Sequence, residues 1–341
     1  MFLRNAWYVA GLRADITREL APLTILGERI VFYRKHDGTP VALEDACPHR
    51  KLPLSKGRLR EDAVECGYHG LKFDCTGKCI AAPTQKLIPA SAQVKSFPCT
   101  DQYGLVWIWM GEPGQADTSL IPSIENYDNP TWKITSGDAM DCACDYLHLV
   151  DNLLDPSHVA WVHASSFAAA GTEDTDITMQ ISDDGVIASR WILDQEPPPF
   201  YADLVKTNGS VDRFQYYEVQ FPSCAINKSI YTAAGKGGSN YAPDDRDYLM
   251  VSYNFLTPVD EDNTRYYWLQ HRNTDPHDDE ITKKIAAGAR TAFEEDREIL
   301  EAVHEGLKNA STPNITLGVD AAAVQFRRAL HKKIEAEQNA K

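Results

Sequence analysis

Four residues near the N-terminus have the types and spacing of metal ligands. Cys47 and His49 form one pair, Cys66 and His69 a second, so the pattern is C-x-H-x16-C-x2-H. A structural zinc site can also use two cysteines and two histidines, but it usually pairs like with like. Here each pair holds one thiol and one imidazole. That mixture suits a two-iron cluster in which one iron takes two thiolates and the other two imidazoles. The spacing therefore favours a mixed-ligand [2Fe–2S] cluster over zinc.

A second group of candidate ligands follows in the middle of the chain. Asp155, His158 and His163 supply one carboxylate and two imidazoles, and two histidines with one carboxylate can hold iron(II) for O₂ activation. On a straight helix the two histidines would point about 140° apart. They converge on one metal only if the helix is distorted or ends between them. Asp155 shares a helix face with His158 and stays open as a ligand. A helix with two ordinary histidines is the alternative.

The long helix predicted over Asp279–Lys308 offers another carboxylate. Asp296 falls in the middle of its apolar stripe, and a buried carboxylate is costly unless it is paired or bound to metal. We expect Asp296, His158 and His163 to bind the iron together; a buried, hydrogen-bonded aspartate is the alternative. The stripe consists of Ile281, Ile285, Ala289, Ala292, Ile299, Leu300, Val303 and Leu307. The acids expected on the solvated side are Glu294, Glu295 and Glu298.

The elements that must position these residues fall into two parts. Short strands and turns dominate the beginning of the chain, and a connector with several prolines and glycines follows at Gly111–Pro130. We place the boundary between residues 1–115 and 116–341. The second part mixes strands with the helical segments Tyr146–His163 and Asp279–Lys308, so the fold class expected is α+β. The expected strands are Leu23–Leu26, Ile30–Arg34, Val41–Glu44, Gly104–Met110, Val186–Leu193, Arg213–Phe221, Tyr248–Leu256 and Thr264–His271.

Composition narrows the class of protein. The chain has 341 residues, enough for two domains, and its net charge of −15 argues against nucleic-acid binding, which needs basic surface. No stretch reaches the roughly 20 apolar residues that span a bilayer, and the N-terminus lacks a secretory signal pattern. We therefore expect a cytoplasmic protein that binds no membrane. No Gly-x-Gly-x-x-Gly motif follows a predicted strand, so electrons from NAD(P)H are expected to arrive through another protein.

Taken together, the motifs resemble those of the Rieske non-haem iron oxygenases. The resemblance rests on C-P-H-R-x15-C-x2-H-G, then D-N-L-L-D-P-S-H-x4-H, then E-D near the C-terminus, and it runs through the whole chain. Asn5–Ala10 and Val106–Trp109 look most like the branch containing vanillate O-demethylase, dicamba monooxygenase and toluenesulfonate methyl-monooxygenase. Respiratory-chain Rieske proteins carry a further cysteine in each cluster loop, where this chain has Leu52 and Tyr68. That difference favours the oxygenase type.

The resemblance implies an N-terminal all-β Rieske domain and a C-terminal helix-grip catalytic domain, in which a curved antiparallel sheet wraps the long helix. It also implies a homotrimer, because in this family the two metal sites are close only across a subunit interface. Asp155 would then carry electrons between His69 of one chain and His158 of its neighbour, rather than bind metal. Asn152 is near enough in sequence to line the iron pocket, with packing as the alternative.

The implied activity is monooxygenation of an aromatic substrate, expected to be an aromatic acid, by O-demethylation or methyl hydroxylation with O₂. Electrons would come from an NAD(P)H-dependent reductase with a ferredoxin-type cluster. The basic stretch His49–Lys95 could steer such an acidic partner, with an ordinary solvated face as the alternative. Ring cis-dihydroxylation is the alternative among enzymes. A Rieske electron carrier is the alternative outside them, although it would not need the second domain. Candidates for substrate contact are Tyr217, Tyr231, Asn254, His271 and Arg272.

Overall fold

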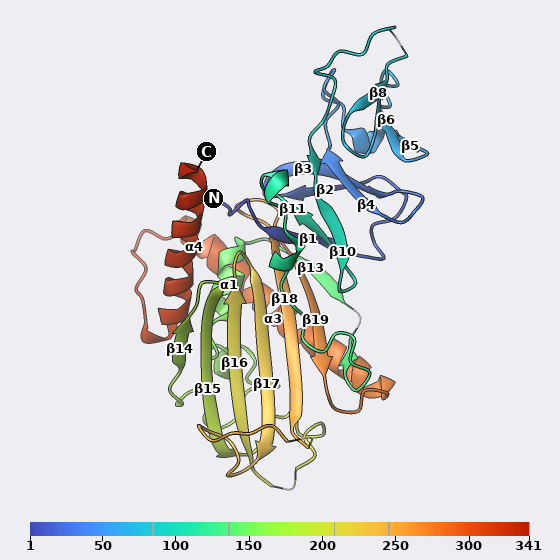
Figure 1. The fold of residues 1–341 in the computed structure, drawn as a ribbon. Coiled ribbons are helices and arrows are strands. Elements are labelled where there is room, and N and C mark those ends of the chain that lie inside the picture. The colour runs from blue at the N-terminus through green and yellow to red at the C-terminus, as the bar shows by residue number, and fades with distance from the viewer. Residues whose placement is uncertain (84, 136, 208, 245, 341) are drawn as a thin grey trace. The chain divides into compact units, whose positions relative to one another are not determined.

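The chain folds into two compact units, each with its own β-sheet structure (Figure 1). The computed structural model describes residues 1–83, 85–135, 137–207, 209–244 and 246–340. The first unit consists of Met1–Ile121, Thr257–Glu261 and Glu337–Lys341, and the second of Pro122–Leu256 and Asp262–Ala336. The boundary predicted near residue 115 lies inside the first unit.

The first unit contains three antiparallel sheets. Their strand orders are β1-β11-β10, β2-β3-β4-β9 and β5-β6-β7-β8. The strands are β1 Trp7–Leu12, β2 Ala21–Ile25, β3 Glu28–Arg34, β4 Pro40–Glu44, β5 Arg58–Arg60, β6 Ala63–Glu65, β7 Lys72–Phe73, β8 Cys79–Ala81, β9 Ser96–Phe97, β10 Cys99–Gln102 and β11 Leu105–Trp109.

The local signals of the first unit are confirmed. The predicted turn at Asp37-Gly38 joins β3 to β4, and Gly38 has the positive φ of 85° that this turn requires. Every residue of β11 is buried, as its continuous apolar run predicts. Two apolar clusters fill the interior, one around Phe32 and Ile108 and the other around Leu43 and Phe73. The second cluster includes Cys47 and Cys66, so it supports the first candidate metal site directly.

The second unit is built on an eight-stranded antiparallel sheet. Its main order is β12-β19-β18-β17-β16-β15-β14, and β13 also pairs with β19. The strands are β12 Lys133–Ile134, β13 Asp138–Cys142, β14 Thr178–Ile181, β15 Gly185–Gln195, β16 Val211–Gln220, β17 Cys224–Ala233, β18 Tyr248–Pro258 and β19 Thr264–Arg272. The four strands predicted here are present, while β12, β13, β14 and β17 were not predicted.

Helices complete the second unit, and α3 lies along one face of its sheet (Figure 1). They are α1 Tyr146–Leu153, α2 Val159–Val162, α3 Asp279–Asn309 and α4 Ala321–Asn339. Phe293 of α3 packs its ring 5.0 Å from Tyr266 and 5.1 Å from Trp268 of β19. Short 3-10 turns occur at Leu54–Lys56, Pro113–Gln115, Thr118–Leu120 and Gly318–Asp320. Within the described ranges, no helix is both long and apolar enough to cross a membrane. The α+β class with antiparallel sheets is confirmed.

The apolar stripe predicted on α3 is only partly buried. Ile285, Ala292, Asp296 and Leu300 are buried, but Ile299, Val303 and Leu307 are 42–48% exposed. A 3.6-residue period shows which helix face can be covered, not how far the covering elements extend along it. The prediction was therefore correct around Asp296 and wrong at the C-terminal end of the helix.

Candidate metal centres

The first candidate centre is made by two loops with the same backbone hydrogen bonding. In each loop the cysteine N–H donates to the carbonyl five residues later: Cys47 to Leu52, and Cys66 to Leu71. Each cysteine carbonyl also accepts from the N–H four residues later, Lys51 or Gly70. Lys51 and Gly70 both have a positive φ, of 58° and 70° respectively. The two loops thus share one backbone hydrogen-bond pattern, although the histidine follows its cysteine by two residues in the first loop and by three in the second.

Within these loops, thiol lies next to thiol and imidazole next to imidazole. Cys47 and Cys66 are buried, and burial together with the neighbouring Cys66 thiol raises the pKa of Cys47. The rings of His49 and His69 lie 4.6 Å apart between centroids. His49 is exposed and His69 half-buried, so the histidine side of the site faces the surface. Separate pairs of sulfur and nitrogen donors fit a cluster in which each iron takes one pair.

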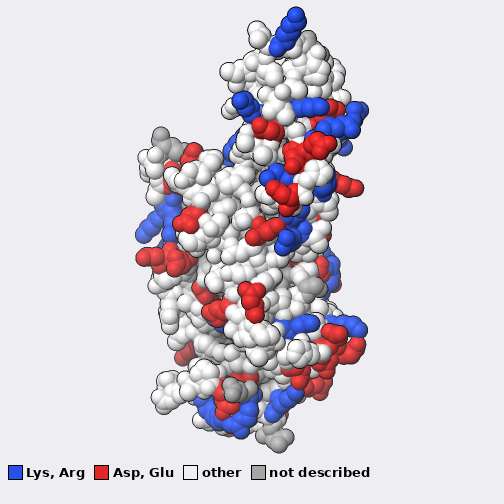
Figure 2. All heavy atoms as spheres, turned by 45° about the vertical axis from the view of Figure 1, so that its right-hand side comes forward, with Lys and Arg blue, Asp and Glu red and all other residues white. Residues whose placement is uncertain are grey.

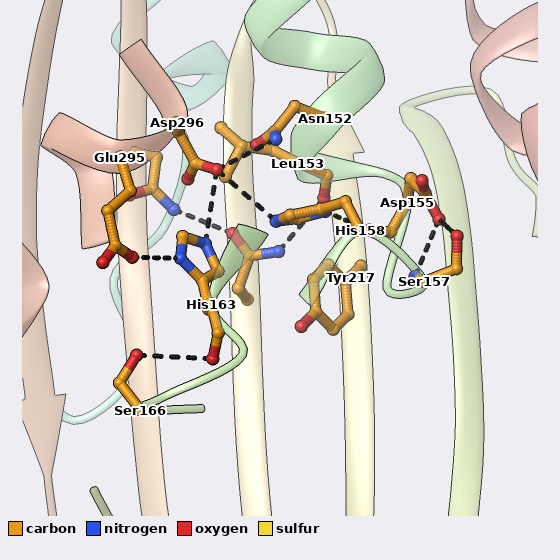
Figure 3. Close-up of polar contacts among 12 residues, drawn as sticks. Asn152, Leu153, Asp155, Ser157, His158, His163, Ser166, Tyr217, Glu295 and Asp296 are labelled. Atoms are coloured by element: carbon orange, nitrogen blue, oxygen red, sulfur yellow. Dashed lines mark hydrogen bonds and ion pairs between the residues drawn. The ribbon is translucent and has the colours of Figure 1, made fainter. Parts of the chain in front are cut away.

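The second candidate centre brings together His158, His163 and Asp296 (Figure 3). One ligand atom from each lies within 4.8 Å of the other two, close enough to hold a single metal ion. The helical segment is interrupted, because α1 ends at Leu153 and α2 covers only Val159–Val162. His158 and His163 therefore flank a four-residue helix. Because α2 ends at Val162, His163 leaves the helical path and the 140° separation expected on a straight helix does not apply.

Hydrogen bonds fix which nitrogen of each imidazole faces Asp296. A carbonyl can only accept, so His158 donates from Nδ1 to the Asp155 carbonyl, which leaves Nε2 3.6 Å from Asp296 Oδ1. The Nδ1 of His163 lies 2.7 Å from Glu295 Oε2, and its Nε2 lies 3.2 Å from Asp296 Oδ1. Partners of this kind orient histidine ligands and raise their basicity.

Glu295 corrects one prediction from the sequence. Its side chain was expected on the solvated side of α3, but it is only 35% exposed and contacts the buried imidazole of His163. Consecutive residues on a helix are rotated by about 100°. Asp296 and Glu295 therefore leave the helix in different directions and reach the two nitrogens of the same imidazole, Nε2 and Nδ1 of His163. The pairing depends on where α2 lies, which the α3 sequence alone does not contain.

Asp296 is 4% exposed and remains ionised despite its burial. Burial raises the pKa of this carboxyl, but the hydrogen bond with His163, the charges of both histidines and a bond from Asn152 outweigh it, so the pKa is lowered. Burial lowers the pKa of His163, whereas its bonds to Asp296 and Glu295 raise it, and the net direction is upward. A buried carboxylate with two imidazole nitrogens directed at it is a donor set suited to iron(II).

Asn152 and Asp155 have different places around this centre. Asn152 Nδ2 donates to Asp296 Oδ1 at 3.1 Å, while its Oδ1 has no partner among the described residues. It positions the carboxylate and is not among the residues that line the cavity. Asp155 Oδ1 accepts a bond from the Ser157 N–H at 2.7 Å, so this carboxylate points away from Asp296 (Figure 3). It lies outside the group of three.

A cavity of about 720 Å³, counted out to its mouth, lies between α3 and the sheet. The three candidate ligands form part of its wall. Its apolar lining includes Phe167, Phe200, Met250 and Phe293. Its polar lining includes Arg213, Tyr217, Asn227, Ser229, Ser252 and Gln270. Of the five residues predicted to contact substrate, Tyr217 lines this cavity, and the other four are not among its lining residues.

A chain of buried hydrogen bonds holds the polar side of the cavity in place. Gln270 donates to Ser252 and Ser252 to Asn254. Asn254 donates to Asn227, which in turn donates to the Leu153 carbonyl at the end of α1. Each side-chain amide therefore has a fixed orientation.

Comparison with known proteins agrees with both centres. The family model for the Rieske [2Fe-2S] domain matches residues 6–98, and that for the vanillate O-demethylase oxygenase C-terminal domain matches residues 142–336. The chain is 36% identical to the vanillate O-demethylase oxygenase subunit of Pseudomonas sp. strain HR199, over 100% of this chain and 97% of that protein. The chain belongs to the vanillate O-demethylase family of Rieske oxygenases.

Other relatives in this family are similar over the same length. The toluene-4-sulfonate monooxygenase iron-sulfur subunit TsaM1 of Comamonas testosteroni is 34% identical, over 99% of this chain and 98% of that protein. The crystal structure of dicamba monooxygenase bound to 3,6-dichlorosalicylic acid has a TM-score of 0.90 at 30% identity, covering 99% of both chains. The protein is thus a Rieske non-haem iron oxygenase with a [2Fe–2S] cluster and a mononuclear iron. The alternatives of a zinc site and a simple electron carrier are rejected.

Sequence reasoning missed two side chains beside the mononuclear centre, Glu295 and Arg213. For Glu295, its position next to a predicted ligand was the available signal. For Arg213, the signal was a cation within a strand otherwise rich in aromatic residues.

Proposed function

We propose that this chain is the oxygenase component of a monooxygenase that converts an aromatic acid by O-demethylation or methyl hydroxylation. The observation that carries the proposal is the position of the three candidate iron ligands in the wall of a cavity rich in aromatic side chains. The names of the relatives support the substrate class, because vanillate, toluene-4-sulfonate and dicamba all combine an aromatic ring with an acidic group.

In this proposal each unit holds one metal group. Residues 1–115 form the cluster domain, with Cys47 and Cys66 on one iron and His49 and His69 on the other. Residues 116–341 form the catalytic domain, where iron(II) is held by His158, His163 and Asp296. When bound, iron with open coordination positions supplies O₂ activation.

The side chains around the iron prepare the site for that chemistry. The Asp155 carbonyl and Glu295 keep Nδ1 of each histidine protonated, so both Nε2 atoms present lone pairs to the metal. Asn152 holds one oxygen of Asp296 in place. The phenyl rings of Phe167 and Phe200, 4.5 Å apart between centroids, exclude water from the neighbouring wall of the cavity.

We further propose a homotrimer in which the Asp155 carboxylate carries electrons between His69 of one chain and His158 of its neighbour. Asp155 is half-buried and its carboxylate is directed away from the metal ligands, so it is available for a second histidine. Trp161, on the adjacent helix α2, is 79% exposed. A large exposed aromatic residue beside the proposed bridge fits a subunit interface.

The electron donor is proposed to be an NAD(P)H-dependent reductase with a ferredoxin-type cluster. Basic side chains exposed around the cluster loops include Arg50, Lys51, Lys56, Arg58 and Arg60. Figure 2 shows that Lys and Arg stand among acidic residues on the visible face of the first unit rather than forming one uninterrupted patch. Long-range steering of an acidic partner would therefore be moderate. A reducing cytoplasm as the location agrees with eight cysteines that all lack disulfide partners.

The test is oxygen uptake by the purified holoenzyme with a surrogate reductase, across methoxy- and methyl-substituted aromatic acids. The expected result is substrate-dependent uptake, with formaldehyde from a methoxy substrate or a hydroxymethyl product from a methyl substrate. A cis-dihydrodiol as the product would show ring dihydroxylation instead. Failure to turn over any member of the panel would contradict the proposal.

A further inference from the structure

Arg213 of β16 is a buried cation in the wall of the substrate cavity. The residue is 5% exposed, and it lines the same cavity as the candidate iron ligands. A guanidinium stays protonated in proteins and presents five N–H donors. Burial of such a group is costly unless an acid or a set of hydrogen bonds compensates the charge.

The protein itself does little to compensate this charge. Arg213 Nη1 donates to the Phe167 carbonyl at 3.3 Å, and its guanidinium lies 5.7 Å from the centre of the Tyr231 ring. Its Nε has no hydrogen-bond partner, and no acid in the described part of the chain forms an ion pair with it. Arg190, on the neighbouring strand β15, is equally buried but donates from Nε, Nη1 and Nη2 to three different oxygens.

The groups that surround Arg213 are neutral phenols. Burial raises the pKa of Tyr217 to about 12, and it also raises the pKa of Tyr201 and of Tyr231. At neutral pH these hydroxyls are protonated and cannot neutralise the guanidinium. Tyr231 likewise has a buried hydroxyl without a partner among the described residues. Arg213 Nε and the Tyr231 hydroxyl are therefore two buried donors that no described residue satisfies, beside a cavity that Arg213 and Tyr217 line.

Arg213 is close to the candidate iron centre. Phe167, whose carbonyl accepts from Arg213, also packs its ring 5.8 Å from the ring of His163. One residue thus separates the guanidinium from an iron ligand.

We propose that Arg213 binds the anionic group, a carboxylate or a sulfonate, of the aromatic substrate and so directs the opposite side of the ring toward His158, His163 and Asp296. The inference rests on the proposed function, since it specifies how that substrate is recognised. The planar guanidinium can donate two parallel bonds to either anion, and the low-polarity surroundings strengthen them. The substrate then supplies the negative charge that the protein does not.

The test compares anionic aromatic ligands with neutral ligands of the same shape. Dissociation constants are measured by calorimetry on the holoenzyme for vanillate, 4-methoxybenzoate and toluene-4-sulfonate, and for the corresponding carboxamides and sulfonamide. The variants are Arg213→Gln, which removes the positive charge, and Arg213→Lys, which keeps the charge but cannot donate two parallel hydrogen bonds. Lys228→Gln is the control, because Lys228 lies on β17 and pairs with Glu125. Visible absorbance of the cluster and the melting temperature verify folding.

We expect Arg213→Gln to weaken binding of the anions by about 10- to 100-fold, the range for loss of a charged hydrogen-bond partner, and to change binding of the amides less than about twofold. Arg213→Lys should show a smaller loss for the same ligands. If Arg213→Gln does not fold, the lysine variant carries the comparison.

Equal losses for anions and amides, or no change for either, would overturn the inference, as would a wild-type protein that binds none of the three anions. Its failure is distinguishable from failure of the proposed function. If the wild-type enzyme demethylates these substrates and Arg213→Gln leaves their binding unchanged, the proposed function stands. The role of Arg213 in binding the anionic group is then wrong.

Discussion

The two metal centres of this protein are built in opposite ways. The cluster ligands lie within 23 consecutive residues, Cys47 to His69, on two loops with identical backbone hydrogen bonds. The iron ligands come from α2 and α3, and His163 and Asp296 are separated by most of the large sheet in the sequence. The first centre depends on local loop conformation, and the second on how a long helix packs against a sheet and a short helix. The local centre should be most sensitive to its ligands, whereas the packed centre should also be sensitive to residues that never touch the metal.

The largest effect is expected from a cluster ligand. Cys66→Ser removes one of the two thiolates that one iron needs, so the cluster should be lost completely. The visible absorbance should disappear while the mononuclear iron remains. Cys75→Ser is the matched control, since Cys75 is exposed and lies outside both loops. A Cys66→Ser protein that kept the cluster spectrum would break the assignment of this centre.

A substitution in the packing of α3 should affect the mononuclear iron centre and leave the cluster intact. Leu300→Ala creates a cavity beneath α3, one turn beyond Asp296, and should lower the free energy of unfolding by about 2–5 kcal/mol. Urea titration of tryptophan fluorescence measures this loss. Leu307→Ala is the control, because Leu307 is 42% exposed, and it should cost less than about 0.5 kcal/mol.

The cluster spectrum should stay intact in folded Leu300→Ala while the affinity for mononuclear iron falls. Equal costs for the two leucine variants would contradict the packing account of the second centre.

A smaller effect on iron binding is expected from Glu295, which does not touch the metal but contacts the iron ligand His163. Glu295→Gln keeps the shape of the side chain but removes the carboxylate that accepts the His163 Nδ1 proton. Iron affinity should fall by about 10- to 100-fold, as for other outer partners of histidine ligands. The affinity is measured by competition with a chelator, and Glu298→Gln, on the exposed side of α3, serves as the control. If the two variants held iron equally well, Glu295 would have no role at the centre.

The same contrast explains how far the sequence could predict the protein. Turn residues and short apolar runs predicted β2, β3, β4 and β11 of the first unit, because those signals act over a few residues, but the other seven strands of that unit were not predicted. β17 was missed because Asn227, Lys228 and Ser229 interrupt its apolar pattern. Asn227 and Ser229 are polar because they line the cavity, a tertiary requirement. Helix α4 was not assigned at all.

At the sites, the sequence predicted Asp296 on the buried face of α3, and it set a condition on the two histidines: the helix must be distorted or end between them. α2 ends at Val162, before His163, so the second form of that condition is met. The sequence did not predict Glu295 against His163 or Arg213 in the cavity wall. Asp212 and Arg213 are both buried although they are adjacent on a strand. The alternation of side chains between the two faces of a strand therefore could not show which of the two residues faces the cavity. Contacts between distant elements decide such positions.

The most direct test of the account is the iron content of Asp296→Ala beside that of wild type, with the cluster spectrum recorded on the same samples. Glu298→Ala serves as the matched acid on α3. The account predicts about three iron atoms per chain for wild type and Glu298→Ala, and about two for Asp296→Ala with an unchanged cluster spectrum. An Asp296→Ala protein that kept the third iron would contradict it.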